Sequence, residues 1–164
     1  MKDPLKYLYR NPKSGVYTGY WACSRPTGKY TGLWPGGLLK RIWVLIGGKP
    51  EKILQPFTGL SKVGVGCDWN RHVHPDIIAD AQHLPIKDDS FDCVLLDPPY
   101  TQTYVAHYAA LDQRIARSKP KFSIYKAFGE GARVTRPGGF LSYCIRLVRS
   151  IQAVISFTVS PALA

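Results

Sequence analysis

Four short apolar segments within residues 52–97 constrain the fold more than any other feature of the sequence. They are "KILQPF" (52–57), "KVGVGCD" (62–68), "DIIAD" (76–80) and "FDCVLLD" (91–97). Each has the length of a strand and a mostly apolar interior, as expected for strands that are covered on both faces. Together they predict an α/β domain with a mostly parallel sheet.

A helix is predicted between Pro35 and the pair Gly47-Gly48. In "PGGLLKRIWVLIGGKP" the apolar residues recur on one helical face, at Leu38, Leu39, Ile42, Trp43 and Ile46. Helices are also predicted at 103–117 and 122–134, the second weakened by two glycines. "RPGG" predicts a turn into the strand "FLSYC", and "AVISFTV" predicts a last strand at 153–159.

The composition is that of one globular domain. The chain has 164 residues, of which 45% are apolar and 20% charged, so its core needs neither disulfides nor metals. Its apolar runs are too short for a membrane span, and its first residues contain no secretory leader. These features predict a cytoplasmic protein without a membrane partner.

Four widely spaced cysteines are expected to be reduced and structural: Cys23, Cys67, Cys93 and Cys144.

The net charge of +11 is unevenly distributed. Residues 1–55 contain ten Lys and Arg against two acids, residues 56–100 three against seven, and residues 101–164 nine against two. Two basic flanks on a compact domain favour a polyanionic partner, most simply nucleic acid, over a surface that is basic only for solubility. The acidic centre needs a separate explanation.

Residues 1–34 show neither helical nor strand periodicity. Tyrosines and tryptophans alternate there with lysines and arginines. Irregular segments of this composition can stack bases and contact phosphates, or they can pack their rings onto a core.

The four predicted strands end in short segments that can contribute to one site. These ends are Phe57-Thr58-Gly59, Asp68-Trp69, Asp80-Ala81 and Asp97-Pro98-Pro99-Tyr100, so three of the four carry a carboxylate. In an open parallel sheet these ends meet at one edge, where ligands bind. A carboxylate after the second strand can accept both hydroxyls of a ribose, and one after the third can accept an adenine amino group.

The segments "ILQPFTG", "GVGCDW", "ADAQHLPIKDDSFDCVLLDPPY" and "ARVTRPGGFL" resemble, in this order, the class I S-adenosylmethionine-dependent methyltransferases. "DPPY" is similar to the catalytic motif of their amino-methylating branch. The resemblance covers about residues 35–145. It implies a Rossmann-like sheet, S-adenosylmethionine as cofactor, an N-terminal extension at residues 1–34 and a methyltransferase catalytic domain at residues 35–164.

By position, the resemblance also implies roles for the residues after the first three strands. Phe57, Thr58 and Gly59 would border the methionine part of the cofactor, Asp68 would bind its ribose, Trp69 would cover an adenine face, and Asp80 with Ala81 would meet the adenine edge. Simpler roles remain open: Asp68 can cap the following turn, Trp69 can belong to the core, and Asp80 can be a solvated acid.

The sequence departs from the family pattern at two places. Only "TGLSK" separates Phe57 from Val63, although parallel neighbours normally need a crossover of about a dozen residues. The first crossover helix is therefore expected to be absent or replaced by an extended link, with a weakened cofactor site. The tail supplies one further strand where the family usually closes with an antiparallel pair, which predicts a minimal sheet with a truncated or divergent C-terminus.

The catalytic residues implied by the resemblance are Asp97, Pro98, Pro99 and Tyr100. The amino nitrogen of a base is a poor nucleophile because its lone pair is delocalised into the ring. Two acceptors, the Asp97 carboxylate and the Pro98 carbonyl, can draw this nitrogen toward tetrahedral geometry and stabilise the charge that develops. The prolines keep the acceptors rigid, and Tyr100 offers a stacking face for a base that has been flipped out.

The leading hypothesis is an enzyme that methylates adenine N6 in nucleic acid, DNA rather than RNA. Alternatives are an RNA guanine-N2 methyltransferase, a protein glutamine methyltransferase and a catalytically silent nucleic-acid-binding relative. No metal is expected, because the spacing of Cys67, His72, His74 and His83 matches no standard ligand pattern.

Overall fold

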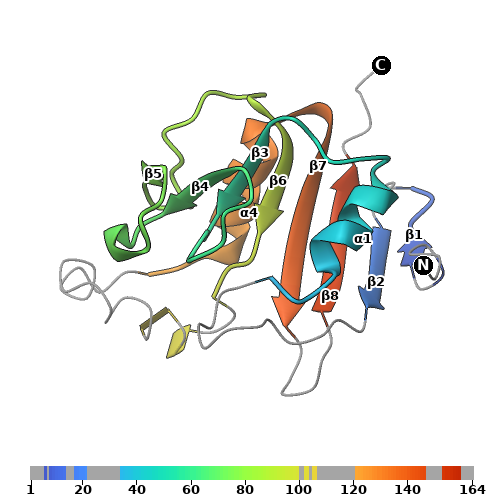
Figure 1. Cartoon of the computed structure of the whole chain (residues 1–164), viewed down its shortest axis with the longest axis horizontal. Coiled ribbons are helices and arrows are strands. Elements are labelled where there is room, and N and C mark those ends of the chain that lie inside the picture. The colour runs from blue at the N-terminus through green and yellow to red at the C-terminus, as the bar shows by residue number, and fades with distance from the viewer. Residues whose placement is uncertain are drawn as a thin grey trace.

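The computed structural model describes residues 6, 8–13, 17–21, 34–99, 102–103, 105–106, 121–146 and 153–159. Their strands form one eight-stranded sheet in the order β1-β2-β8-β7-β6-β3-β4-β5 (Figure 1). The strands are β1 (Leu8–Arg10), β2 (Tyr17–Trp21), β3 (Ile53–Pro56), β4 (Val65–Asp68), β5 (Ile77–Ile78), β6 (Phe91–Leu96), β7 (Thr135–Arg146) and β8 (Ala153–Val159). The α-helices are α1 (Leu38–Leu45) and α4 (Ile124–Val134), and η2 (Arg71–Val73) is a short 3-10 helix.

Five neighbouring strands, from β5 through β4, β3 and β6 to β7, run parallel. On β3, Leu54 pairs with Val65 on one side and with Val94 on the other. The three pairs at the other end of the sheet are antiparallel. This arrangement confirms the predicted α/β, Rossmann-like and mostly parallel fold.

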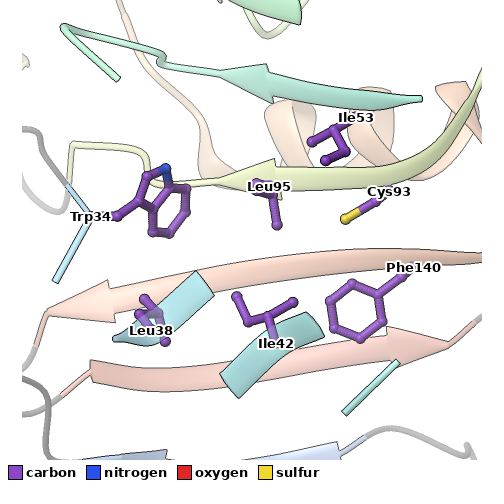
Figure 2. Close-up of a cluster of buried hydrophobic side chains, with 7 residues drawn as sticks. All are labelled: Trp34, Leu38, Ile42, Ile53, Cys93, Leu95 and Phe140. Carbon is purple, nitrogen blue, oxygen red and sulfur yellow. The ribbon is translucent and has the colours of Figure 1, made fainter. Parts of the chain in front are cut away.

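The central strands are buried on both faces, because alternate side chains of a strand point to opposite sides. Ile53, Cys93, Leu95 and Phe140 pack against α1 in one apolar cluster (Figure 2). Their immediate neighbours in sequence belong to a second cluster, which includes Val134 of α4: Leu54, Val94, Leu96 and Leu141. Among the described residues, α1 therefore covers one face of the sheet and α4 covers the other.

The helix α1 ends as its sequence predicts. Gly47 adopts φ 80°, a conformation that costs glycine little. The amide of Gly48 donates to the carbonyl of Trp43 at 2.7 Å, and the amide of Gly47 donates to that of Val44 at 3.4 Å. This pair of bonds is a Schellman motif, which satisfies carbonyls that the helix leaves open.

One of the two glycines of α4, Gly131, serves close packing. A Cβ at Gly131 would stand 3.1 Å from a methyl group of Leu96 and from one of Leu141. The absence of a side chain lets the helix approach β6 and β7 closely. The predicted helix at 122–134 is thus confirmed, with its first turn beginning at Ile124.

The prediction of a turn at "RPGG" is wrong, because these residues lie inside β7. Phe91 pairs with Thr135 and Cys93 pairs with Phe140, so two steps along β6 correspond to five along β7. The extra residues form a bulge in which Gly138 has φ 74°. A bulge absorbs the residues that would otherwise end the strand.

The N-terminal segment contains strands that its sequence does not predict. β2 pairs antiparallel with β8, with Gly19 opposite Ile155, and β1 pairs with β2. The predicted last strand at 153–159 is confirmed as β8, and the strand beyond it in the sheet comes from the N-terminal segment. β1 and β2 therefore share one sheet with the predicted catalytic domain.

Most of the predicted helix at 103–117 lies outside the described residues, of which 102–103 and 105–106 are helical. Within the described part of the chain, no helix combines the length and the apolar character that crossing a bilayer requires.

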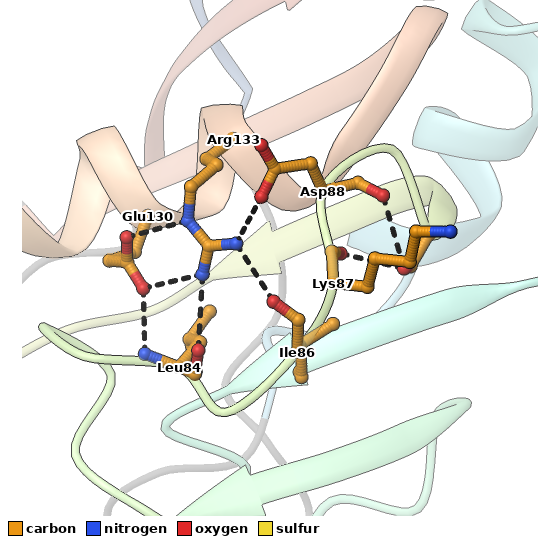
Figure 3. A network of polar contacts seen from close by, with 7 residues as sticks. Leu84, Ile86, Lys87, Asp88, Glu130 and Arg133 are labelled. Atoms are coloured by element: carbon orange, nitrogen blue, oxygen red, sulfur yellow. Dashed lines mark hydrogen bonds and ion pairs between the residues drawn. The ribbon is translucent and has the colours of Figure 1, made fainter.

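A polar network fixes the loop between β5 and β6 along α4 (Figure 3). The Arg133 guanidinium donates to both carboxylate oxygens of Glu130 at 2.8 Å, to Asp88 at 2.6 Å, and to the carbonyls of Ile86 and Leu84 at 2.8 and 3.1 Å. Glu130 also accepts the amide of Leu84 at 2.7 Å. The guanidinium of Arg133 thus fastens the loop to α4 by hydrogen bonds, without a crossover helix between β5 and β6.

Arg133→Lys should lower the free energy of unfolding by about 1–3 kcal/mol, because an ammonium cannot reproduce five donor contacts in a plane. Arg136→Lys is the matched control. Arg136 is exposed and forms an ion pair with Asp92 at 3.2 Å, so its replacement should cost less than about 1 kcal/mol. Urea unfolding of both variants measures the difference, and equal losses would contradict the role of the network.

The network should also make stability depend on pH. The hydrogen bond from Arg133 lowers the pKa of Glu130 from its ordinary value of 4.5. The ionised Glu130 therefore stabilises the fold above this value, and the stabilisation is lost as the pH falls through the lowered pKa. Wild type should be more stable than Glu130→Gln at about pH 7, and the gap should close below about pH 4.5. Urea unfolding across this range checks it, and a constant gap would refute it.

Candidate functional site

The candidate site lies where the parallel strands end. β3 leads into Phe57-Thr58-Gly59, β4 ends at Asp68, and β6 leads into Asp97-Pro98-Pro99. The chain runs from β3 to β4 and β5 on one side, and β6 and β7 continue on the other. The strand order thus reverses between β3 and β6, which is where open α/β sheets bind ligands. Tyr100 lies outside the described residues.

The link between β3 and β4, residues 57–64, contains no helix, as the sequence predicts. Two glycines allow so short a connection. A Cβ at Gly64 would stand 2.4 Å from the carbonyl oxygen of Ile53, and one at Gly66 would stand 2.8 Å from the hydroxyl of Thr58. Because these positions lack side chains, the link packs directly onto the two strands.

Asp68 holds this link in place. One carboxylate oxygen accepts the amide of Gly59 at 3.0 Å, and the other accepts the amide of Asn70 at 2.9 Å. Burial raises the pKa of Asp68 above its ordinary value. A backbone hydrogen bond from Trp69 also reaches this carboxylate. Asp68 thus both caps the following turn and holds the link.

Phe57 occupies a strained position at the end of β3. Its φ is 60°, which is unfavourable for a bulky side chain. Its ring packs edge-on against Phe122, with centroids 5.6 Å apart. The carbonyl of Phe122 in turn accepts Gln102 at 3.0 Å. The segment before α4 therefore joins the end of β3 to the segment after "DPPY".

Asp80 is held by a residue that the sequence does not single out. Gln82 is buried and donates to the Asp80 carboxylate through its backbone amide at 2.9 Å and its side-chain nitrogen at 3.1 Å. Its side chain also donates to the carbonyl of Lys121 at 3.2 Å and accepts the amide of Ser123 at 2.7 Å. Asp80 is thus a hydrogen-bonded acid and not a freely solvated one.

The remaining predicted site residues differ in exposure. Ala81 and Pro98 are buried, whereas Trp69, Asp97 and Pro99 are half-buried.

Sequence reasoning missed Gln82 and Phe122, because their partners lie about 40 and 65 residues away in the chain. The only local signal is that Gln82 directly follows Asp80-Ala81.

The buried thiols offer no nucleophile. Burial raises the pKa of Cys67 and that of Cys93 to about 12, so both remain protonated at neutral pH. Both are free cysteines in the core, as predicted for these two, whereas Cys23 and the side chain of Cys144 lie outside the described part of the chain. Among the described residues, no group of three or more His, Cys, Asp or Glu side chains is placed to hold a metal ion.

Comparison with known proteins assigns no family. No protein-family model matches the chain, and no curated protein matches its sequence. Among solved structures, it is similar to a Thermotoga maritima protein described as a SAM-dependent methyltransferase and possible histamine N-methyltransferase, with 20% identity and a TM-score of 0.38. The match covers 57% of this chain and 44% of that protein, which is less than half of its length.

Phe57→Gly should unfold at a higher urea concentration than Phe57→Ala, although both variants lose the ring. Glycine adopts φ 60° freely, whereas alanine carries a strain of about 1 kcal/mol there. Leu60 provides the control, because it lies in the same link without a positive φ. There the order should reverse, with alanine more stable than glycine. The same order at both positions would show that Phe57 is unstrained.

Proposed function

We propose that this protein transfers a methyl group from S-adenosylmethionine to an exocyclic amino nitrogen of a nucleic-acid base, with adenine N6 in DNA as the target. The observation that carries the proposal is the place of Asp97-Pro98-Pro99. These residues directly follow β6, beside the reversal of strand order. A rigid acceptor pair at a ligand-binding edge suits the activation of an amino group.

The link at 57–64 favours a cofactor without phosphate at this position. A pyrophosphate needs backbone amides at the start of a helix. Here the amide of Thr58 donates to Cys67 at 3.1 Å, that of Ser61 to Thr58 at 2.9 Å, and that of Gly59 to Asp68. These donors are already used, and S-adenosylmethionine, which has no phosphate, does not require them.

The donor set fits the adenosine part of such a cofactor. The Asp68 carboxylate accepts backbone amides and has acceptor capacity left for a ribose hydroxyl. Asp80, held by Gln82, can accept an amino group of adenine, beside Ala81. Half-buried Trp69 can cover an adenine face, while Phe57, Thr58 and Gly59 would border the methionine part.

In the proposed mechanism the protein positions the amino nitrogen and stabilises its charge. The Asp97 carboxylate and the Pro98 carbonyl would accept its two N–H bonds, so that its lone pair turns away from the ring. Tyr100 would stack on the base. When bound, S-adenosylmethionine would supply the methyl group: the N–C bond would form as the S–C bond breaks, the sulfonium would become a thioether, and the surplus proton on the nitrogen would pass to water. Positioning of the reacting atoms supplies much of the acceleration.

The charge distribution supports a nucleic-acid substrate. The chain carries a net charge of +11, and the start of α4 faces the same edge of the sheet as Phe57. Lys121, Tyr125 and Lys126 are exposed there. Exposed lysines attract phosphates, and an exposed ring can stack on a base.

Three further candidates remain. The basic flanks would serve an RNA guanine-N2 methyltransferase equally well. The absence of a helix at 57–64 favours a nucleic-acid-binding relative without catalysis. Protein glutamine methylation would use the same acceptor pair on a side-chain amide.

Incubation with radiolabelled S-adenosylmethionine and separate DNA, RNA and protein substrates tests the proposal. We expect label in DNA, as N6-methyladenine after digestion to nucleosides. Label in RNA or protein would redirect the substrate class, and cofactor binding without any transfer would support the silent relative.

Asp97→Ala should lower turnover by about 10²–10³-fold, the cost of losing one preorganised partner of a developing charge. Affinity for S-adenosylmethionine, measured by calorimetry, should persist because the change lies beyond the cofactor contacts. Glu51→Ala is the control, since it removes an exposed acid just before β3, at the opposite end of that strand. If Asp97→Ala keeps the wild-type turnover, the acceptor-pair mechanism is wrong and "DPPY" is only a rigid turn.

A further inference from the structure

We infer that Gln82 is a positioning residue that couples two binding events, that of the cofactor's adenine at Asp80 and that of nucleic acid at residues 121–126. The inference rests on the proposed function and adds a means by which the two ligands of that site favour each other's binding. The side chain of Gln82 is only 6% exposed, so it acts through the groups that it holds.

The side-chain amide of Gln82 has one orientation. Its nitrogen carries two hydrogens and donates to the Asp80 carboxylate at 3.1 Å and to the carbonyl of Lys121 at 3.2 Å. Its oxygen accepts the backbone amide of Ser123 at 2.7 Å. A flipped amide would turn its oxygen toward two acceptors and its nitrogen toward a donor, so the three bonds require the same orientation.

Gln82 holds the Asp80 carboxylate in two ways. One carboxylate oxygen accepts the backbone amide of Gln82 at 2.9 Å, and the other accepts its side-chain nitrogen at 3.1 Å. Asp80 is half-buried, which leaves part of the carboxylate open to a ligand. In the proposed site this carboxylate accepts the amino group of adenine, so Gln82 sets the direction of the acceptor that adenine meets.

At its other end Gln82 holds the backbone on both sides of Phe122. The ring of Phe122 packs against Phe57 with centroids 5.6 Å apart, and the carbonyl of Phe122 accepts the side chain of Gln102 at 3.0 Å. The segment that Gln82 holds therefore contacts both the end of β3 and the residues that follow "DPPY".

The same segment carries the exposed side chains that are proposed to meet nucleic acid. Lys121 and Lys126 are exposed, and Tyr125 is 87% exposed. Lys121 is the direct link, because its carbonyl accepts Gln82 while its side chain is open to solvent. An exposed lysine attracts phosphate, and an exposed ring can stack on a base.

The shared amide makes the two binding events cooperative. Adenine binds the carboxylate, and nucleic acid binds the segment 121–126, each in the position that Gln82 holds. Each ligand therefore favours the state in which all three bonds are formed, and this is the state that the other ligand needs. Such coupling is reciprocal, so each ligand must raise the affinity of the other by the same factor.

Fluorescence anisotropy of a labelled single-stranded DNA oligonucleotide that contains adenine measures this factor. S-adenosylhomocysteine serves as the second ligand, because it keeps the adenosine and has no methyl group to transfer. When it is saturating, wild type should bind the oligonucleotide about fivefold to tenfold more tightly. Hydrogen exchange at the Ser123 amide should also slow when S-adenosylhomocysteine alone is added, because this amide donates to Gln82.

Two variants remove the link. Gln82→Met keeps the size of the side chain without its hydrogen bonds. Gln82→Glu keeps an acceptor for Ser123 but cannot, when ionised, donate to Asp80 or to the carbonyl of Lys121. In both variants the factor should fall below about twofold, although each ligand still binds alone.

Arg133→Lys is the matched control. Arg133 holds the same loop to the same helix, but through the carbonyls of Leu84 and Ile86. The coupling factor is a ratio of two affinities, so a general loss of stability does not change it. Arg133→Lys should therefore keep the wild-type factor, and so would both Gln82 variants if Gln82 only stabilised the loop.

The outcomes separate this inference from the proposed function. If wild type binds neither ligand or transfers no methyl group, the proposed function is wrong and this inference with it. If wild type transfers a methyl group but its factor stays near one, or exchange at Ser123 is unchanged, the inference alone is wrong. A wild-type factor in a folded Gln82 variant, or a lost factor in Arg133→Lys, also overturns the inference alone.

Discussion

Burial of both faces of β3, β6 and β7 is the constraint on which the rest of the structure depends. Each of these strands sends alternate side chains into two separate apolar clusters. Neither cluster can form without a cover, and α1 and α4 supply one for each face. Because the strand interiors are apolar, polar groups gather mainly where the strands end, which places Asp68 and Asp97 at a common edge.

The connection before β4 (residues 57–64) and the one after β5 (residues 79–90) contain no helix. The link at 57–64 packs onto the strands through Gly64 and Gly66. The loop between β5 and β6 instead runs along α4, held near its start by Gln82 and farther on by Arg133. Hydrogen bonds thus hold this loop in place, whereas a crossover helix is usually held by its apolar face.

The same hydrogen bonds connect the parts of the candidate site. Gln82 orients Asp80 and also fixes the segment that carries Phe122, and Phe122 packs against Phe57. The ends of β3 and β5 are therefore joined through the start of α4. On the α1 face of the sheet, Gln55 and Ser142 each have a buried oxygen without a hydrogen-bond partner among the described residues, and they lie on β3 and β7, the two neighbours of β6. Polar groups thus lie near this edge on both faces of the sheet.

Elements whose signals are local could be predicted from the residues alone. The apolar runs predict β3, β4, β5 and β6, the helical period and two glycines predict α1, and the short "TGLSK" predicts a link without a helix. The sequence also determined that Phe57, Asp68 and Asp97 meet at one edge, since parallel strands end on the same side.

Features that depend on distant partners could not be predicted in this way, because they are set by how the segments pack together. β2 becomes a strand because β8 offers it an edge, and "RPGG" stays within β7 because pairing with β6 absorbs its extra residues in a bulge. The partners of Gln82 and the burial of Gln55 and Ser142 are set in the same way. Composition and period describe a residue's own segment, whereas a hydrogen bond or its absence depends on which other segment packs there.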